Sequence, residues 1–243
     1  MIKNDLLGIG DTARYIGVSD KTLRRWEKNG KFLPSYKSDG GTRYYSKVKL
    51  NLFLNDSVEL ARAWVVSNTG ENITPEQHCE ISTVFQARLE RMYFDLVRNG
   101  DLSKNTVALV TAVVGEVGQN SFDHNLGNWP DISGVFFSYN VEKREVVLAD
   151  RGQGVLKTLK RTRGELKTDE DALKVAFTEI VSGRAPENRG NGLKFVRKQV
   201  QEKFENLIFQ SGGTEIMIEN DVKDLIISHK EISYSGCFVR IKF

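Results

Sequence analysis

The sequence predicts an α+β protein with a small N-terminal domain, a helical connector and a larger C-terminal domain. The 243 residues are long for one average domain, and helical spacing of apolar residues dominates the first half of the chain, whereas strand-like runs follow it. Strands that follow helices, instead of alternating with them, favour an α+β sandwich over repeated βαβ units. We expect the domains to cover residues 1–55, 56–103 and 104–243.

The composition predicts a folded cytoplasmic protein. Hydrophobic residues make up 40% and charged residues 28%, which is enough apolar mass for a packed core. The longest nearly uncharged apolar run, Val107 to Val117, contains Glu116 and is too short to span a bilayer. The N-terminus lacks a signal-peptide apolar region, and two cysteines, Cys79 and Cys237, suit a reducing compartment. We therefore expect no membrane partner.

The charge is distributed unevenly between the two ends of the chain. Residues 1–50 carry 11 lysines or arginines and 5 acidic residues, whereas the other residues carry 24 and 27. A small basic module ahead of a mildly acidic one is typical of a chain whose first module binds a polyanion.

The first 55 residues predict two helices, a turn and a wing. Asp11 to Ile16 can form a short helix, Gly17 can supply a turn, and Lys21 to Lys28 can form a second helix. Pro34 and two glycines punctuate the stretch from Lys31 to Tyr45, which predicts a two-stranded wing. A third helix is expected after Ser46.

The stretch from Gly10 to Ser46, GDTARYIGVSDKTLRRWEKNGKFLPSYKSDGGTRYYS, resembles the winged helix-turn-helix of the MerR and excisionase families. The resemblance implies that the second helix enters the major groove of double-stranded DNA while the wing reaches the flanking backbone. Leu23 and Trp26 are expected in the core of this domain. The residues expected to contact DNA are Lys21, Thr22, Arg24, Arg25, Arg43 and Tyr44.

The connector is expected to be helical. Val58 to Val66 has helical character, Ser67 to Thr74 is polar, and apolar residues recur at helical spacing from Ile81 to Leu96. These helices are long enough to form a homodimer.

The C-terminal domain predicts a helix, a hairpin and further strands. A helix is expected from Asn105 to His124, and Val135 to Tyr139 with Glu145 to Ala149 predict a hairpin that delivers Asp150 to a strand end. A helix from Gly192 to Phe204 and four strands should follow, at Leu207 to Gln210, Thr214 to Ile218, Leu225 to Ser228 and Phe238 to Phe243.

Three short boxes carry the chemistry of this domain. Glu116, Asn120 and His124 are spaced four apart, so they form a polar stripe on an otherwise apolar helix. The box D-R-G-Q-G, from Asp150 to Gly154, follows a strand, and G-N-G, ending at Gly192, opens a helix. Glycines at a helix N-terminus let the backbone approach phosphates.

The order E-x-x-x-N, D-x-G-x-G and G-x-G resembles the Bergerat fold of the GHKL ATPases, a superfamily that includes DNA gyrase, the MutL proteins and the histidine kinases. The resemblance covers roughly residues 105–243 and implies ATP and Mg²⁺ as cofactors. It implies that Asn120 holds Mg²⁺, that Asp150 accepts the adenine amino group and that Glu116 is the general base. The implied nucleotide-binding residues are Asn120, Asp150, Gly152, Gly154, Arg184, Arg189, Gly190, Asn191, Gly192 and Leu193.

The resemblance also implies a mobile lid from Leu156 to Arg189, and the sequence departs from the superfamily in two places. Lys194 stands where many members carry a further glycine. Cys237 stands where the superfamily has a threonine whose hydroxyl contacts adenine through water. We expect a stiffer lid hinge and weaker adenine binding.

Together these features predict a nucleotide-responsive transcriptional regulator that binds DNA and ATP. One alternative is a protein kinase of the anti-sigma or histidine-kinase type, which acts on a protein partner through the same ATP site. His78 is the candidate phosphoacceptor for its autokinase version. Another alternative is a module that holds ATP structurally.

Overall fold

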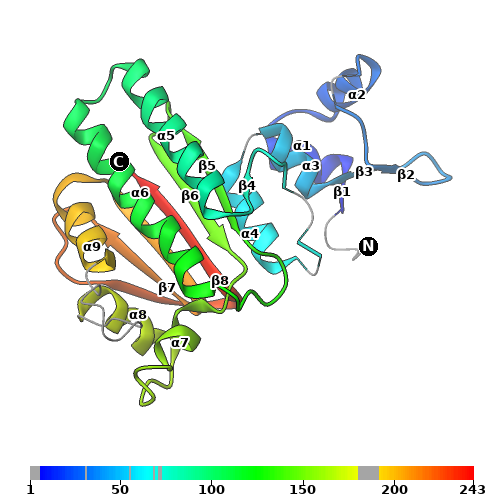
Figure 1. Cartoon of the computed structure of the whole chain (residues 1–243). Helices are drawn as coiled ribbons and strands as arrows, with labels where there is room; N and C mark the ends of the chain where they lie inside the picture. The colour runs from blue at the N-terminus through cyan, green and yellow to red at the C-terminus, as the bar shows by residue number, and fades with distance from the viewer. Residues whose placement is uncertain (1–5, 31, 55, 68, 71–72, 180–191) are drawn as a thin grey trace. The chain divides into compact units, whose positions relative to one another are not determined.

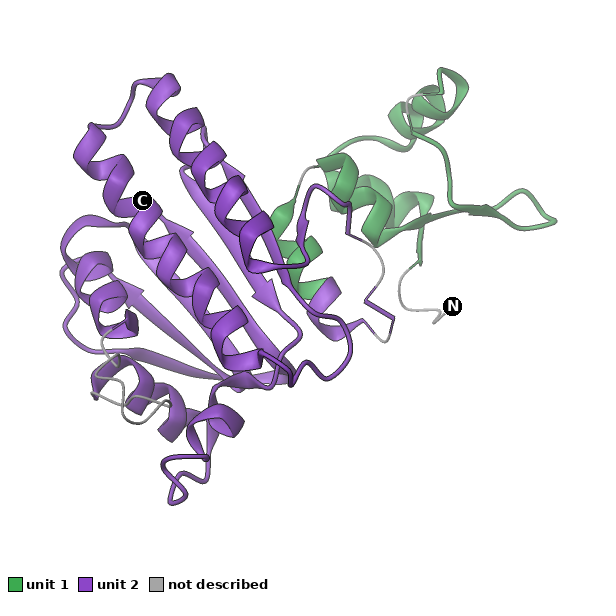
Figure 2. Cartoon of the chain, viewed as in Figure 1, with its two compact units in different colours: residues 1–63 green, residues 64–243 purple. Residues whose placement is uncertain are grey.

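The computed structural model describes residues 6–30, 32–54, 56–67, 69–70, 73–179 and 192–243. The chain divides into two compact units, residues 1–63 and 64–243 (Figure 2). The division falls inside helix α4 (Ser57–Val66). Because the described residues form helices and antiparallel sheets, the predicted α+β class is confirmed. The domain boundaries predicted after residues 55 and 103 stay predictions.

Unit 1 contains a helix-turn-helix, a small sheet and a third helix (Figure 1). Its helices, besides the first part of α4, are α1 (Ile9–Ile16), α2 (Asp20–Lys28) and α3 (Lys47–Leu54). Its strands are β1 (Leu6–Gly8), β2 (Tyr36–Lys37) and β3 (Arg43–Ser46), which pair antiparallel in the order β1–β3–β2.

Local sequence explains the turn between α1 and α2. Gly17 adopts a left-handed conformation with φ 71°, which other residues rarely reach, and it ends α1. Two residues later, the Ser19 hydroxyl accepts a hydrogen bond from the backbone N–H of Thr22 at 3.2 Å and so caps α2.

An aromatic cluster and a few aliphatic side chains form the core of unit 1. The predicted core residue Leu23 is fully buried, as is Tyr45. The Trp26 ring packs 5.1 Å from the ring of Phe53, which in turn lies 4.8 Å from Phe32. Burying each such side chain stabilises the fold by about 1.5–3 kcal/mol, so this small unit depends on few contacts.

Unit 2 is an antiparallel five-stranded sheet with helices packed against it (Figure 1). The strands lie in the order β4–β5–β6–β8–β7, namely β4 (His78–Cys79), β5 (Val135–Asn140), β6 (Glu145–Asp150), β8 (Ile226–Lys242) and β7 (Asn206–Glu219). The helices are α5 (Ser82–Asn99), α6 (Lys104–Asn125), α7 (Gly154–Leu159), α8 (Asp169–Thr178) and α9 (Gly192–Lys203).

Helices α5 and α6 pack against each other and against the sheet. The apolar stripe of α5, which includes Phe85, Leu89 and Met92, is buried together with the valines of α6 in the core of unit 2. This face of α5 is therefore covered. A dimer contact through α5 would have to use its exposed side, where Phe94 is 54% exposed.

Two differences from the predicted elements have clear physical causes. The four strands expected after α9 are two long strands, because β7 continues through Gly212 and β8 continues through residues 229–237 without leaving the sheet. The register shifts on both sides of Gly212, which is an irregularity in the β7–β8 pairing. Strands β1 and β4 were not predicted, since three and two residues are too few to show an alternating pattern.

The segment expected as a lid is partly a packed element. Within it, α8 buries Leu173 and Phe177 completely, and the Phe177 ring lies 5.3 Å from that of Phe209. The described part of this segment, up to residue 179, therefore belongs to the folded body.

Candidate functional site

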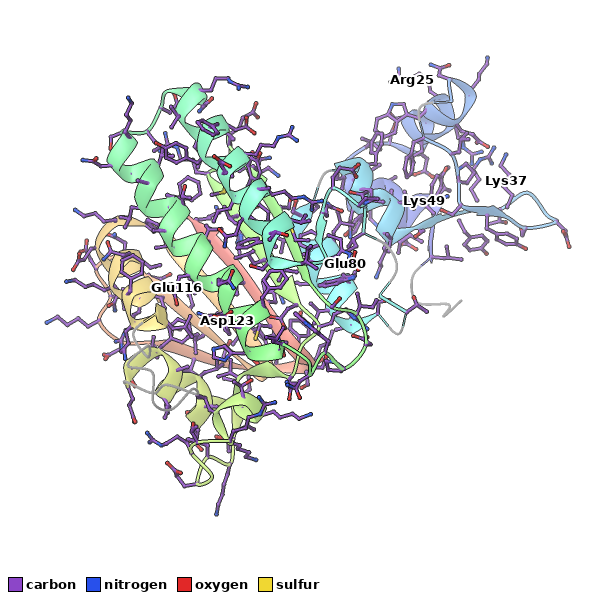
Figure 3. All side chains as sticks on the ribbon, viewed as in Figure 1. Arg25, Lys37, Lys49, Glu80, Glu116 and Asp123 are labelled. Carbon is purple, nitrogen blue, oxygen red and sulfur yellow. The ribbon has the colours of Figure 1, made fainter. Side chains whose placement is uncertain are left out.

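Helix α2 presents a basic face in unit 1. Lys21, Arg24 and Arg25 are exposed, whereas Leu23 points into the core. Figure 3 shows Arg25 on α2 and Lys37 on the wing. Residues three and four apart share one helix face, so these cations form one surface suited to a polyanion. Thr22 lies beside them with its hydroxyl 3.0 Å from that of Ser19.

Glu27 of α2 ties the wing to this helix. Arg43 of β3 donates to Glu27 through Nε at 2.6 Å, and Lys37 of β2 forms an ion pair with the same carboxylate. Hydrogen bonds from Lys37 and then from Arg43 lower the pKa of Glu27. Arg43 therefore positions the wing, while the ring of Tyr44 stacks on that of Tyr36 at 5.9 Å.

A cavity in unit 2 gathers the predicted nucleotide-binding residues that the structure describes, except Gly152, which does not line it. It lies between α6, the end of β6, α7 and the start of α9. Its lining includes six predicted residues, Glu116, Asn120, Asp150, Gly154, Gly192 and Leu193. These residues come from three segments far apart in the sequence, so the fold brings the three boxes to one place.

Asp150 is the buried acid of this cavity, with 2% of its surface exposed. The Ser121 hydroxyl donates to its Oδ2 at 2.7 Å, and the Gly152 N–H donates to its Oδ1 at 2.8 Å. Burial raises the pKa of Asp150, and hydrogen bonds from Ser121, from the Gly152 N–H and from Cys237 oppose the rise. The carboxylate lines the cavity, where it can accept a hydrogen bond from a bound ligand.

Glu116 and Asn120 lie one turn apart on α6 and face the start of α9. The Asn120 amide nitrogen lies 3.4 Å from Glu116 Oε1. A methyl group placed on Gly192 would overlap the Glu116 carboxylate. The absence of a side chain at Gly192 therefore lets the N-terminus of α9 approach the carboxylate closely, in the part of the cavity where an anionic group would meet backbone N–H groups. Figure 3 shows Glu116 on α6.

Gly152 is required by a close approach on the other side of Asp150. A side chain there would overlap the amide of Asn125, which accepts a hydrogen bond from the Gln153 N–H at 2.8 Å. The Asn125 amide also donates to the carbonyl oxygen of Ser121 at 2.8 Å. These bonds fix the loop after β6 against the end of α6.

The thiol of Cys237 lines the cavity next to Asp150, its partner in the β6–β8 pairing. Burial, and then the negative charge of Asp150, raise the pKa of Cys237 well above that of an ordinary thiol. The side chain is therefore a neutral thiol at physiological pH, which is a weak hydrogen-bond donor and acceptor compared with a hydroxyl.

Four predicted ligand-binding residues lie outside the described residues, namely Arg184, Arg189, Gly190 and Asn191. Their expected contacts stay predictions.

The chemistry of the cavity fits a magnesium ion that is carried by phosphates. The described residues include no group of three or more His, Cys, Asp or Glu side chains that could hold a metal alone. Mg²⁺ commonly keeps several waters and takes one or two protein oxygens plus substrate phosphates. The amide oxygen of Asn120 is an oxygen donor of this type.

His78 does not lie on a helix, as a phosphoacceptor would require. It lies in the two-residue strand β4, opposite Phe136. A ring nitrogen is 2.9 Å from the carbonyl oxygen of Ser133, and the Trp64 ring is 6.0 Å away. The half-buried imidazole therefore has a structural role here.

Sequence reasoning missed Ser121 and Asn125, which hold Asp150 and the loop after it. A signal existed: both residues extend the stripe of Val110, Val114 and Val117 on α6 at helical spacing. Polar residues that continue an apolar stripe point to the edge of the core, where a site begins.

Ser121→Ala should make ligand binding more sensitive to acid. Loss of the hydroxyl removes a hydrogen bond that favours the ionised form of Asp150, so the already raised pKa rises further. If the ionised carboxylate accepts a hydrogen bond from the ligand, affinity falls as the pH drops below this pKa, and the fall starts at a higher pH in the variant. Calorimetric titration with ATP across a pH series measures this. Identical pH profiles for the two proteins would contradict it.

Comparisons with known proteins give one family model and several solved structures. Residues 8–45 match the family model described as MerR family regulatory protein. Solved structures that match include the ATPase region of Saccharomyces cerevisiae topoisomerase II, at 12% identity and a TM-score of 0.36, over 54% of this chain and 36% of that one. The same region bound to ICRF-187 (dexrazoxane) matches at 12% identity and a TM-score of 0.37, over 54% and 37%. This chain therefore spans little more than a third of those chains.

A comparison with curated proteins finds no match. No helix in the described part of the chain is both long and apolar enough to cross a membrane.

Proposed function

We propose that this chain is a DNA-binding regulator whose unit 2 binds ATP with Mg²⁺ and modulates the DNA-binding module of unit 1. The observation that carries the nucleotide half is the cavity. Glu116 and Asn120 of α6, Asp150 of β6 and Gly192 of α9 come from separate boxes and line the same space. An apolar cavity with a few convergent polar groups and a buried acid of shifted pKa is typical of a ligand site.

Each residue in the cavity has a role that follows from its surroundings. Asp150 accepts a hydrogen bond from the adenine amino group, through a buried carboxylate that Ser121 and Gly152 hold in place. The start of α9 offers backbone N–H groups to the phosphates. Mg²⁺, when bound, neutralises phosphate charge, and Asn120 would supply an oxygen to it. Glu116, one turn before Asn120, is the proposed general base for an attacking water.

Calorimetric titration of the full chain with Mg²⁺ and ATP, ADP or a non-hydrolysable ATP analogue tests the nucleotide half. We expect saturable heat with one site per chain. The absence of heat with every adenine nucleotide would overturn this half of the proposal, whatever the result for DNA.

The DNA half rests on the family match over residues 8–45 and on the exposed basic face of α2. Protein–phosphate contacts release counterions, so affinity should fall steeply with salt. Arg24→Ala should remove one such contact and lower the slope of log affinity against log salt by about 0.9. Gel shifts with a random-sequence DNA pool at several salt concentrations measure this slope.

Arg98→Ala is the matched control for Arg24→Ala, since Arg98 is also exposed but lies on α5 in unit 2. It should leave the slope unchanged. Arg43→Ala should weaken binding for another reason, because it releases the wing from Glu27. Salt-independent shifts, or the same loss from Arg98→Ala, would contradict the assigned surface.

We place the regulator in the cytoplasm with its DNA. If a homodimer forms, the preferred DNA site should contain two half-sites. The kinase alternative uses the same cavity but passes the γ-phosphate to a protein. Because His78 is half-buried in a strand, transfer to a separate protein partner is the version of that alternative to test.

A further inference from the structure

Arg151 faces away from the cavity that its neighbours line. It follows Asp150 at the end of β6, and its side chain is 7% exposed. Its guanidinium donates to the backbone carbonyl oxygens of Trp64 and Val65, the second at 3.3 Å, and to the carboxylate of Asp131, through Nε at 3.0 Å. One buried cation thus joins the loop before β5 to the last turn of α4.

The bonds to α4 supply what a helix end lacks. The last four carbonyl groups of a helix have no intrahelical donor, and a positive charge near them is favourable. The Trp64 ring also lies 5.8 Å from the guanidinium carbon of Arg151, and its indole N–H donates to the carbonyl oxygen of Gly70 at 2.9 Å. If Arg151 shifted, the Val65 carbonyl would lose this donor and the Trp64 carbonyl would be left with the Ser67 N–H, at 3.3 Å.

The same short segment is bonded to the cavity wall. Asp150 is held by Ser121 and by the Gly152 N–H, and the Gln153 N–H donates to Asn125. The backbone of Arg151 therefore lies between residues whose positions a ligand on Asp150 would fix. Its side chain passes that constraint to α4 without touching the cavity.

We infer that Arg151 is a positioning residue that makes the order of the last turn of α4 depend on occupancy of the cavity. This inference rests on the proposed nucleotide site. Coupling between two positions is reciprocal, so anything that fixes residues 150–153 also steadies the turn they hold. Helix α4 begins at Ser57, within the residues of unit 1. A nucleotide-sensitive α4 is therefore a covalent route from the cavity to the DNA-binding unit.

Hydrogen exchange of the full chain, read by mass spectrometry with and without Mg²⁺ and ADP, tests this. In the wild type, ADP should slow exchange at residues 150–155 and, on the order of fivefold, at the amides of residues 62–66. In Arg151→Lys, which keeps the charge but loses the planar fork, the first effect should remain and the second should disappear. Arg163→Lys is the control, since among the described residues the Arg163 guanidinium pairs with Glu165 and Glu179, which lie on the surface away from α4 in the sequence.

Two outcomes would overturn the inference. One is protection of residues 150–155 without protection of α4 in the wild type. The other is unchanged α4 protection in Arg151→Lys. Circular dichroism checks that Arg151→Lys folds. If that variant does not fold, Asp131→Asn replaces it, because this change keeps the arginine and removes only its carboxylate partner. Asp131→Asn should show a partial loss of the ADP-dependent protection of α4.

A second experiment needs no nucleotide, so it tests the role of Arg151 even if the proposed nucleotide site is wrong. Gly152→Ala should push the segment away from Asn125 and speed exchange at residues 62–66. The same change in the Arg151→Lys background should have no such effect. Equal acceleration in both backgrounds would show that Arg151 carries no coupling, even if ADP binds nowhere.

Discussion

Asp150→Asn is expected to weaken binding of adenine nucleotides strongly while the protein stays folded. The substitution keeps the size of the side chain but replaces an acceptor oxygen with an amide that donates. A ligand amino group then meets a donor or an unpaired group, at a cost on the order of 1–3 kcal/mol, which is roughly 5- to 150-fold in affinity. Calorimetry with Mg²⁺ and ATP measures the loss.

The melting temperature of Asp150→Asn distinguishes a binding defect from an unfolding defect, and the pKa of Asp150 predicts its direction. Burial raises this pKa in the folded chain, so folding is less favourable once the pH rises through the window between the ordinary aspartate pKa and the raised one. Asparagine has no such loss at neutral pH. We therefore expect the melting temperature of Asp150→Asn to equal or exceed that of the wild type.

The matched control is Asp224→Asn, which changes an exposed aspartate of unit 2. It should change neither binding nor melting. Wild-type affinity in Asp150→Asn would show that the buried acid does not contact the base, and a lowered melting temperature would point to a structural role.

The helices of this protein could be predicted closely because their signals are local. The predicted start and end of the helix from Asn105 to His124 differ from α6 by one residue at each end. Ser103 caps α6 by accepting the Thr106 N–H at 3.1 Å. The limits of the strands were less predictable. Strand β7 continues through a glycine pair and β8 through a polar stretch, and both of these patterns are typical of turns. Pairing with a distant strand decides those limits, and no local pattern records it.

The site was predictable to the extent that its residues occur in short boxes. Glu116, Asn120 and Asp150 could be found by spacing and order, and they line one cavity. The contacts that hold them could not, because Ser121 reaches Asp150 across 29 positions and Arg151 reaches Trp64 across 87. Such bonds depend on the packed fold. Sequence spacing along a helix gives only neighbours within one or two turns.

Glu116→Gln and Asn120→Ala should separate hydrolysis from binding. Glu116 is the carboxylate that faces the start of α9, and a water attacking a phosphate there needs a base within hydrogen-bond reach. The amide of Glu116→Gln keeps the shape but cannot take a proton, so we expect ATP binding to remain and phosphate release to fall by about 10²- to 10⁴-fold. Asn120→Ala should instead make ATP affinity the same with Mg²⁺ as with EDTA.

The fate of the γ-phosphate distinguishes the candidate activities. It can be measured by incubating the protein with γ-labelled ATP and separating free phosphate from labelled protein. Glu90→Gln, an exposed carboxylate on α5, is the control and should release phosphate at the wild-type rate. If the protein hydrolyses ATP, the wild type should release free phosphate and Glu116→Gln should release very little. A kinase would release little phosphate and label a partner protein, whereas a structural nucleotide would give neither. Wild-type turnover in Glu116→Gln would show that the base is another group, because no amide can replace a carboxylate in that step.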